Sequence, residues 1–422
     1  MEKSTLIAVA LAWAALTANV ARAEEIAAPP QTIEQRLSIL ERKYEIDREE
    51  AAARAAAKPA DLKINAYIQS DYRDYLSDND AFTDQFTLRR ARVNLESAVN
   101  KKTKLRILAE LAGSPAVLDA YADFTHNPAL SLRVGKFKGP LGLERLQSIT
   151  HISFIELAFP TSLAPNRDVG LQLSGDLGGG LFSYQAAIQN GVTDGGSTES
   201  DTNDGKDYIA RVFAHPFKRT AGFLQGLGLG VAASIGEQQG TAASSQLPSY
   251  RTNGQQTFFS YRSGDTFAFG DRTRVSPQAY WYHNNISLLG EYTVSEQEIQ
   301  RATTTTTMDS IANRAWVVAG TWILTGEKTS YRGVKPKNKK WGALELAGRY
   351  SELRIDNKAF PRYANIATAA RRAKAWTGGL NWYLNDAVKI ISNYEYTTFE
   401  GGAATGNRRP ERALLSRVQL VY

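Results

Sequence analysis

The sequence contains no cysteine, so no disulfide bond holds its fold together. It also lacks a long apolar run: the longest, from Leu6 to Ala18, falls short of the ~20 residues that a membrane-spanning helix needs. This length excludes a helical membrane protein. Only four histidines are present, and none stands in HExxH or another metal-ligand spacing. We therefore expect no enzyme, no bound metal or other cofactor, and no nucleic-acid partner.

Residues 1–23 have the anatomy of a secretory signal peptide. A lysine near the start precedes the apolar run, and small residues at Ala21 and Ala23 form a cleavage site. Cleavage would leave a mature chain beginning near Glu24. The alternative is a single membrane anchor, for which the run is too short. Absence of cysteine also fits an exported protein that does not rely on disulfides.

The net charge of the remaining chain is positive. Residues 1–59 hold 8 Lys/Arg and 9 Asp/Glu, which leaves 42 Lys/Arg against 34 Asp/Glu, or +8, in residues 60–422. A basic body favours an anionic partner, although net charge says nothing about the fold.

Residues 24–59 are expected to form a periplasmic helix. Ile33, Leu37, Leu40 and Tyr44 follow one another at alternating spacings of four and three, which is the spacing of a short coiled-coil seam. A helix this polar is marginal in water when isolated, so a partner helix from another subunit is one interpretation. A frayed periplasmic spacer is the other.

From residue 64 to the last residue, apolar side chains recur with a period of two, which is typical of strands with one apolar and one polar face. Leu344, Leu346 and Tyr350, for example, alternate with Glu345 and Arg349. Strands of about 9 to 11 residues match a tilted crossing of the hydrocarbon layer. We predict sixteen strands, at residues 64–73, 86–96, 103–111, 117–125, 130–138, 168–175, 181–190, 207–215, 228–236, 274–283, 285–294, 315–324, 342–351, 375–383, 387–397 and 413–422.

Short and long connections between these strands mostly alternate. Short turns follow the second, fourth, sixth, tenth and fourteenth strands, whereas mostly long polar connections follow the first, fifth, seventh, ninth, eleventh, thirteenth and fifteenth. The exceptions are a short connection after the third strand and a long one at residues 325–341. The pattern is that of an outer-membrane barrel with tight periplasmic turns and long external loops. Residues 60–422 are thus predicted to form an all-β, 16-stranded antiparallel transmembrane β-barrel, with residues 258–261 as a possible extra strand.

A large soluble sandwich or propeller is the alternative fold. Aromatic residues such as Trp281, Trp322 and Trp382 recur near strand ends, as the interfacial girdles of a membrane barrel require. No repeat of ~40 residues with a blade signature is present. Both observations favour the membrane barrel.

A sixteen-stranded barrel can enclose an aqueous channel, whose selectivity depends on the charges that line it. Alternation places Arg90 and Arg92 toward the lumen and leaves Arg89 ambiguous unless a bulge intervenes. Lumen positions elsewhere carry both signs of charge, so selectivity requires a local cluster of cations.

The stretch RVGKFKGPLGLERLQS, at residues 133–148, supplies such a cluster. Strict alternation would turn Lys136 and Lys138 toward lipid, where a cation at mid-membrane costs roughly 2 to 4 kcal/mol. Gly135 permits a bulge, and the Gly-Pro pair at 139–140 ends strand pairing. We infer that the chain leaves the barrel wall here.

Residues 139–167 are too apolar for a loop in water, which predicts a constriction loop folded into the barrel. This loop would place Lys136, Lys138 and Arg167 beside the wall arginines. A lid closed over the mouth of the barrel is the alternative.

These motifs resemble the phosphate-selective porins O and P, which are trimeric outer-membrane channels for phosphate and polyphosphate. The resemblance covers residues 60–422 and rests on QFTLRRARVNLE (85–96), RVGKFKGPLGLERLQS (133–148), FIELAFPTSLAPNRDVGLQLSG (154–175), WILTGEKTSY (322–331), GALELAGRYSEL (342–353) and the terminal strand. It implies a homotrimer in the outer membrane of a bacterium. The anion-binding residues that it implies are Arg73, Arg89, Arg90, Arg92, Lys136, Lys138 and Arg167.

The expected function is therefore an outer-membrane porin that passes anions, phosphate or polyphosphate, through a basic constriction. A general diffusion porin with little or cation-leaning selectivity is the alternative. An outer-membrane hydrolase would need a nucleophile beside a base on one face of the barrel, and the four histidines fall at strand ends or in loops.

Overall fold

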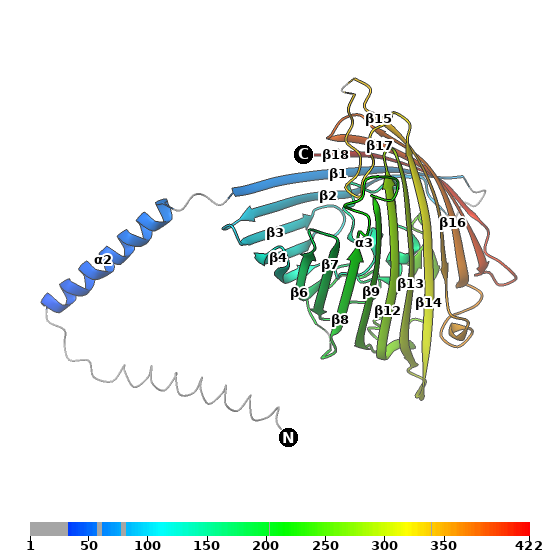
Figure 1. Ribbon diagram of the computed structural model, residues 1–422. Helices are drawn as coiled ribbons and strands as arrows, with labels where there is room; N and C mark the ends of the chain where they lie inside the picture. Colours follow the sequence, from blue (N-terminus) through cyan, green and yellow to red (C-terminus); the bar gives the residue numbers. More distant parts are fainter. Residues whose placement is uncertain (1–32, 57–60, 77–81, 202, 339) are drawn as a thin grey trace. The chain divides into compact units, whose positions relative to one another are not determined.

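The structure is a computed structural model that describes residues 33–56, 61–76, 82–201, 203–338 and 340–422. The chain divides into two units, residues 1–60 and residues 61–422, of which the second contains all the strands (Figure 1). The predicted signal peptide, residues 1–23, lies outside the described residues.

The first unit contains one described helix, α2 (Ile33–Ala56), of 24 residues. Side chains of the predicted seam are exposed along it: Leu37 is 55%, Leu40 62% and Tyr44 70% exposed. Across the part of the chain that the structure describes, no helix is both long enough and apolar enough to cross a membrane.

The second unit is a closed antiparallel barrel of sixteen strands, which confirms the predicted fold class. Consecutive wall strands pair with each other, and the last strand returns to the first, where Tyr67 is opposite Val421. The wall strands are β1 (Asp61–Tyr75), β2 (Gln85–Ala98), β3 (Thr103–Glu110), β4 (Ala116–Asn127), β5 (Leu130–Phe137), β6 (Asp168–Leu177), β7 (Phe182–Gln189), β8 (Asp207–Ala214), β9 (Leu227–Gln239), β12 (Thr266–His283), β13 (Ile286–Arg301), β14 (Thr304–Ile323), β15 (Ala343–Arg354), β16 (Ala370–Tyr383), β17 (Val388–Gly401) and β18 (Glu411–Val421).

Each wall strand corresponds to one predicted strand, but β13 and β14 are much longer than predicted, at 16 and 20 residues. The long polar connection expected after the eleventh strand is wrong, because residues 295–314 mostly continue these two strands and only residues 302–303 join them. A strand that extends beyond the hydrocarbon layer need not carry apolar side chains on its outer face, so its sequence loses the alternation that marks the membrane-spanning part. Residues 258–261 add no wall strand: β11 (Thr257–Phe259) pairs with β10 (Tyr250–Arg251) in a separate two-stranded sheet.

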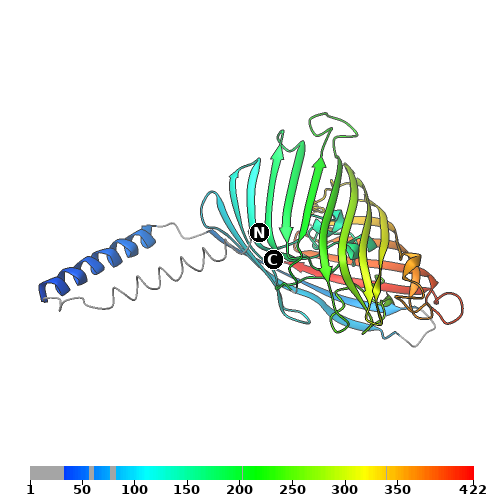
Figure 2. The same cartoon turned by 90° about the horizontal axis from the view of Figure 1, so that it is seen from below.

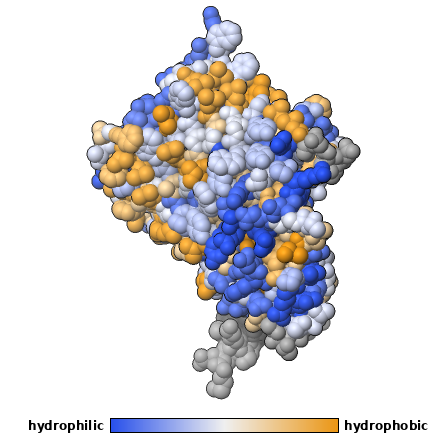
Figure 3. All heavy atoms as spheres, turned by 90° about the vertical axis from the view of Figure 1, so that its right-hand side faces the viewer, coloured by the Kyte–Doolittle hydropathy of each residue, from blue (hydrophilic) through white to orange (hydrophobic). Residues whose placement is uncertain are grey.

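The outer face of the barrel is apolar over most strands. Exposed residues there include Leu171, Val212, Val231, Leu288 and Leu380, which are each more than 40% exposed. On the face drawn in Figure 3, apolar surface (orange) and strongly polar surface (blue) lie side by side. Such exposure would be unfavourable in water and is suited to contact with lipid.

The connection between β5 and β6, residues 138–167, lies inside the ring of strands (Figure 2). It contains α3 (Leu143–Leu146) and the 3₁₀ turn η1 (Phe159–Leu163). Lumen-facing side chains hold it: Ile155 N donates to Asn393 (2.7 Å), and Lys389 donates to Ile152 O (2.8 Å). The predicted infolded loop is therefore confirmed, and a lid over the mouth is excluded.

This infolded connection reaches both sides of the bore. At its start, Phe137 and Leu141 are fully buried in a cluster with Ile209 of β8 and Ala232 of β9. Farther along, the backbone N–H of Leu143 donates to the carboxylate of Glu291 on β13 (2.9 Å). Ile155 is bound to Asn393 of β17, which lies across the ring of strands from β8 and β9, so the connection is attached to opposite walls and divides the bore.

A second connection also enters the barrel, which the sequence did not predict. Residues 240–265 carry β10 and β11, and the rings of Phe258 and Phe159 meet edge to face at 5.8 Å. Asn253 donates to Glu395 on β17 (2.8 Å), and Tyr75 donates to Gly254 O (2.5 Å). The bore is thus narrowed by two connections that pack against each other.

Candidate functional site

Two successive arginines of β2 point into the lumen, which strict alternation does not allow. The register of β1 and β2 shifts between Gln69 and Ser70, so that Gln69 is opposite Arg90 and Ser70 is opposite Leu88. Arg89 is the extra residue of this bulge. A bulge of this kind re-aims one side chain, and here it turns Arg89 to the same side as Arg90.

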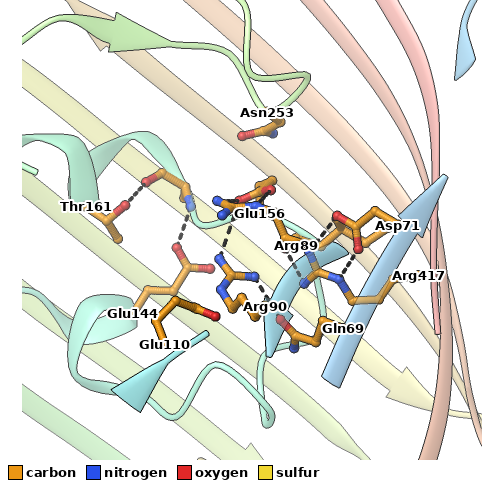
Figure 4. Close-up of polar contacts among 12 residues, drawn as sticks. Gln69, Asp71, Arg89, Arg90, Glu110, Glu144, Glu156, Thr161, Asn253 and Arg417 are labelled. Carbon is orange, nitrogen blue, oxygen red and sulfur yellow. Dashed lines mark hydrogen bonds and ion pairs between the residues drawn. The ribbon is translucent and has the colours of Figure 1, made fainter. Parts of the chain in front are cut away.

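Three wall arginines converge on one carboxylate of the infolded connection, Glu156 (Figure 4). Arg73 donates to Glu156 Oε1 (2.6 Å), and Arg89 forms a two-pronged contact with both oxygens (2.8 and 3.1 Å). Arg90 lies 3.8 Å from Glu156 Oε2 and donates to Gln69 (2.8 Å). We call these four residues, Arg73, Arg89, Arg90 and Glu156, the Glu156 hub.

The Glu156 hub keeps a positive excess. Burial raises the pKa of the Glu156 carboxyl, but the guanidinium groups of Arg89 and Arg90 outweigh it and hold the pKa well below its usual range. Glu156 is therefore ionised, and one negative charge faces three positive ones. Asp71 pairs with Arg417 (2.6 Å) and also lies 3.2 Å from Arg73, so four arginines share two carboxylates and the hub attracts a further anion.

A second group of cations lies where the infolded connection begins and ends. Lys138 donates to the backbone oxygens of Arg145 (2.7 Å) and Gln147 (3.1 Å), and Arg145 donates to Thr161 O (2.5 Å). Arg167 donates to Asp119 of β4 (2.7 Å). We call Lys138, Arg145 and Arg167 the loop cations. They carry three positive charges against one paired carboxylate.

The loop cations repel one another. Burial, and then the neighbouring Arg167 and Arg145, lower the pKa of the Lys138 ammonium well below its usual value. Burial and Arg167 likewise lower the pKa of Arg145 to about 10. A bound anion would relieve this repulsion, because it favours the charged form of each group.

Lys136 lies apart from the cavity. Its ammonium donates to Val117 O (2.7 Å) and to Glu199 of the connection between β7 and β8 (3.0 Å). Gly135 has φ +128°, yet the β5 register with β4 and β6 does not shift there, so Lys136 keeps the side of Val134. The strand does not turn this residue inward; a carbonyl and a carboxylate near the end of β5 satisfy it instead. Its role in anion binding stays a prediction.

Arg92 completes the predicted set. It donates to Glu110 (2.7 Å) and to the Tyr67 hydroxyl (2.8 Å) and lines the cavity beside Arg89 and Arg90.

The candidate site residues predicted from the sequence leave out five cavity cations, Arg106, Arg133, Arg145, Arg211 and Arg251. Arg133 of β5 forms a two-pronged contact with Asp123 (2.7 and 2.9 Å) and lies over the Tyr121 ring (3.9 Å). Its position was readable, because it alternates with Leu132 and Val134. Arg145 lies in a connection without a repeating pattern, so no sequence signal gave its direction.

These groups surround a cavity of about 1210 Å³ between the β1–β8 wall and the two inserted connections. In the described part of the chain, ten of its lining residues are basic and four are acidic. The basic ones are Arg89, Arg90, Arg92, Arg106, Arg133, Lys138, Arg145, Arg167, Arg211 and Arg251, and the acidic ones are Asp119, Glu144, Glu156 and Asp194.

Each of the four acidic lining residues is already paired with an arginine. Glu144 lies 3.5 Å from Arg349, and Asp194 lies 2.6 Å from Arg274, while Asp119 and Glu156 hold the arginines named above. Among the described residues, Lys138, Arg145, Arg211 and Arg251 line the cavity without a carboxylate partner. The cavity therefore presents free positive charge and no free negative charge.

A third segment reaches the cavity from the opposite end of the barrel. Tyr331, in the connection between β14 and β15, donates to Leu143 O (2.5 Å), and Gln147 donates to Tyr331 O (2.9 Å). The Tyr331 ring stacks on Tyr280 of β12 at 5.4 Å. This contact ties residues 324–342 to the infolded connection.

Comparison with known proteins places the chain beside porins. The family described as phosphate-selective porin O and P matches residues 62–421. Porin O of Pseudomonas aeruginosa is 24% identical over 365 residues, which cover 80% of this chain and 83% of that protein. A protein of Aquifex aeolicus with no described function is 27% identical over 219 residues, or 43% of this chain and 53% of its own length.

Two solved structures illustrate the likeness in fold. The outer membrane channel DcaP of Acinetobacter baumannii has a TM-score of 0.55 at 10% identity, and the match covers 86% of this chain and 97% of the DcaP chain. An anion-selective porin from Comamonas acidovorans has a TM-score of 0.52 at 12% identity, and the match covers 86% of this chain and 100% of the chain of that porin. Identities this low carry the barrel architecture alone.

Proposed function

This chain belongs to the phosphate-selective porin O and P family and is a channel of the bacterial outer membrane, and from that premise we propose that it passes small oxyanions, with phosphate and polyphosphate as its substrates. One observation carries the proposal: the cavity has ten basic and four acidic lining residues, and every one of those acids is already bound to an arginine.

Oxyanions suit this lining better than spherical ions do. A guanidinium donates two parallel N–H groups to two oxygens of one phosphate, whereas an ammonium offers a compact charge. Arg145 and Arg211 have no carboxylate to occupy their forks, and Lys138 donates only to backbone oxygens. These donors replace the water that an anion loses on entering.

Passage also requires release. The Glu156 hub and the loop cations are separate groups that both border the cavity, so an anion can pass from one to the other. Several weak sites in series support flux better than one strong site, because the anion must leave as readily as it enters.

The experiment measures the phosphate concentration that blocks the chloride current through the channel in a planar bilayer. We expect phosphate to block the wild-type channel, and the Lys138→Gln/Arg145→Gln double variant to need about 25-fold more phosphate, since each of the two unbalanced charges is worth on the order of 1 kcal/mol, or about fivefold, at contact in water. Lys101→Gln/Lys102→Gln is the matched control, because it removes the same charge from an exposed turn that does not line the cavity. Absence of block in the wild type, or equal block in the double variant, would contradict phosphate recognition at this site.

We also propose that three chains assemble. Leu37, Leu40 and Tyr44 of α2 are more than half exposed at coiled-coil spacing, which suits contact with a second helix. OmpT of Vibrio cholerae, of similar fold (TM-score 0.55), is described in a trimer form. Mass measurement of the intact protein in mild detergent should give three chains, and a one-chain mass would refute the assembly.

A further inference from the structure

Three arginines stand side by side on the outer face of the barrel. The strand register places Arg314 of β14 opposite Arg354 of β15, and Arg354 opposite Arg372 of β16. Their sequence neighbours Ala315, Leu353 and Ala373 are fully buried, so the arginines take the outer side. Like charges directly opposite each other in adjacent strands destabilise a sheet. The row is therefore unfavourable unless an anion lies over it.

The protein supplies too few carboxylates to balance this row. Arg372 lies 3.3 Å from Glu352 and 2.8 Å from Glu400, and Glu400 also lies 3.3 Å from Lys374. Arg314 and Arg354 are exposed, and neither has a carboxylate partner within the described residues. Within 4 Å, two acids thus face four cations on the four neighbouring strands β14 to β17.

The row lies at the depth of lipid headgroups. From Arg314 to the end of β14 at Ile323 there are ten residues, which is the length of one tilted crossing of the hydrocarbon layer. Trp322 stands at the far end of that crossing and is 51% exposed. Arg314 is therefore at the opposite interface, on the side of the long external connections.

An aromatic band borders the row on its membrane side. Trp316, Tyr350 and Trp376 come from the same three strands, with ring centroids 4.9 and 4.3 Å apart. Aromatic rings at this level mark the boundary between headgroups and hydrocarbon. The cations therefore lie on the external side of the band, and the apolar wall of the barrel lies on its membrane side.

A groove continues from the band toward β18. It has a volume of about 490 Å³ and is lined by Trp376, Gly378, Tyr394, Tyr396 and Arg412, with Thr377 at its base. A Cβ at Gly378 would meet no atom within 4 Å, so the floor of the groove is open. Arg412 lies 5.8 Å from the centre of the Tyr396 ring. The groove offers apolar and aromatic walls with one cation at its edge.

We propose that this face binds a phosphorylated lipid of the external leaflet. Its phosphate lies between Arg314 and Arg354, where the guanidinium forks donate N–H groups to two of its oxygens, and Lys374 adds charge. One acyl chain follows Trp316, Tyr350 and Trp376 toward the groove. The lipid supplies the negative charge that the row lacks, so it stabilises the pairing of β14 with β15.

The test is titration of the purified channel, in a neutral detergent, with lipid A and with dephosphorylated lipid A, followed by native mass spectrometry. We expect lipid A to remain bound to the wild type and its dephosphorylated form to bind much more weakly. Each basic residue near an anionic lipid is worth roughly fivefold in affinity, so Arg314→Gln/Arg354→Gln should bind lipid A about 25-fold more weakly.

The matched control is Lys101→Gln/Lys102→Gln, which removes the same charge from an exposed turn at the opposite end of the barrel. It should bind lipid A like the wild type. Both double variants should keep the single-channel conductance of the wild type, which reports that the barrel is folded and does not depend on phosphate transport through it. Equal binding of the two lipids overturns the proposal. So does unchanged lipid A binding by Arg314→Gln/Arg354→Gln, or a change in the number of associated chains, which would assign the face to a second copy.

Discussion

Lys138 and Arg145 combine three properties that a side chain needs in order to attract an anion passing through the cavity. Both line the cavity, both donate to backbone oxygens, and neither is held by a carboxylate in the described chain. Arg89 and Arg90 line the same cavity, yet they share Glu156 with Arg73. Two of the four described cavity cations without a carboxylate partner therefore come from the infolded connection.

Lys138 should make the selectivity depend on pH. Burial, Arg167 and Arg145 lower its pKa, and Arg92 adds to this, while Asp119 raises it. As the pH rises through this lowered pKa, Lys138 loses its charge, so preference for anions should already fall in the pH range below the ordinary lysine pKa of about 10.4. The measurement is the reversal potential in a salt gradient as a function of pH.

Two variants at this position separate charge from structure. Lys138→Arg should hold its anion preference over that range, since a guanidinium remains protonated, and Lys138→Met should show a low and constant preference. Identical pH curves for the wild type and Lys138→Arg would mean that another group is responsible.

Glu156 should be essential to the attachment of the infolded connection. Glu156→Gln leaves Arg90, which is 95% buried, without a carboxylate and leaves buried Arg73 with Asp71 alone (3.2 Å), and breaking a buried pair in this way costs about 3 to 5 kcal/mol. We expect lower thermal stability in detergent and a noisier single-channel current. Glu199→Gln, at a 64% exposed side chain, is the control and should change the stability little.

The same carboxyl gives a pH prediction. Its folded pKa lies below its unfolded value, so its contribution to stability is present above the unfolded pKa of about 4.3 and is lost as the pH falls through the folded one. Wild-type stability should therefore fall below about pH 4 in part through Glu156, and Glu156→Gln should lose that part of the acid dependence. An acid profile identical in both proteins would exclude Glu156 as its source.

Residue positions were predictable from the sequence where a strand repeats regularly. Alternation placed Arg90 and Arg92 in the lumen, as the structure does. Arg89 needed a bulge that arises from the pairing of β1 with β2, which one strand's sequence does not contain. Lys136 took the lipid side because Val117 O and Glu199 satisfy it there, and Glu199 is distant in sequence.

At the scale of elements, three segments converge inside the barrel. The connection after β5 crosses the bore, residues 240–265 pack on it through Phe258 and Phe159, and Tyr331 ties residues 324–342 to it. The infolded connection was predictable because its apolar content does not suit water. Residues 240–265 were not, because Tyr250, Phe258 and Phe259 stand among polar and small residues that read as an ordinary loop.

Tyr331 should restrict the channel from the end opposite the long connections. Tyr331→Ala removes the hydrogen bond to Leu143 O and the stack on Tyr280, together worth about 2 kcal/mol. We expect a larger and noisier single-channel conductance, because the infolded connection loses one of its attachments. Tyr331→Phe keeps the ring, so its single-channel conductance should lie between those of the wild type and Tyr331→Ala. Unchanged conductance in Tyr331→Ala would show that the contact does not narrow the path.

At the scale of the whole molecule, closure of sixteen strands fixes which side chains meet. Period-two alternation and loop lengths predicted the number of strands, because lipid on one side and water on the other select alternate residues. The same rule lapses where β13 and β14 leave the membrane, so their true lengths were not predictable. The charge balance of the cavity could not be predicted from the sequence either. Asp119, Glu144 and Asp194 pair with arginines that are distant in sequence and meet them only in the folded barrel.

The sign of the reversal potential in a gradient of potassium chloride tests the central claim most directly. In the described chain, every acid that lines the cavity is paired with an arginine, whereas four lining cations have no carboxylate partner. The wild type should therefore give the reversal potential of an anion-selective channel at neutral pH. Preference for anions should fall in Lys138→Gln/Arg145→Gln, which removes two of these four cations, and stay unchanged in Lys101→Gln/Lys102→Gln. A wild-type potential of the cation-selective sign, or one near zero, would contradict the account and identify a general diffusion porin.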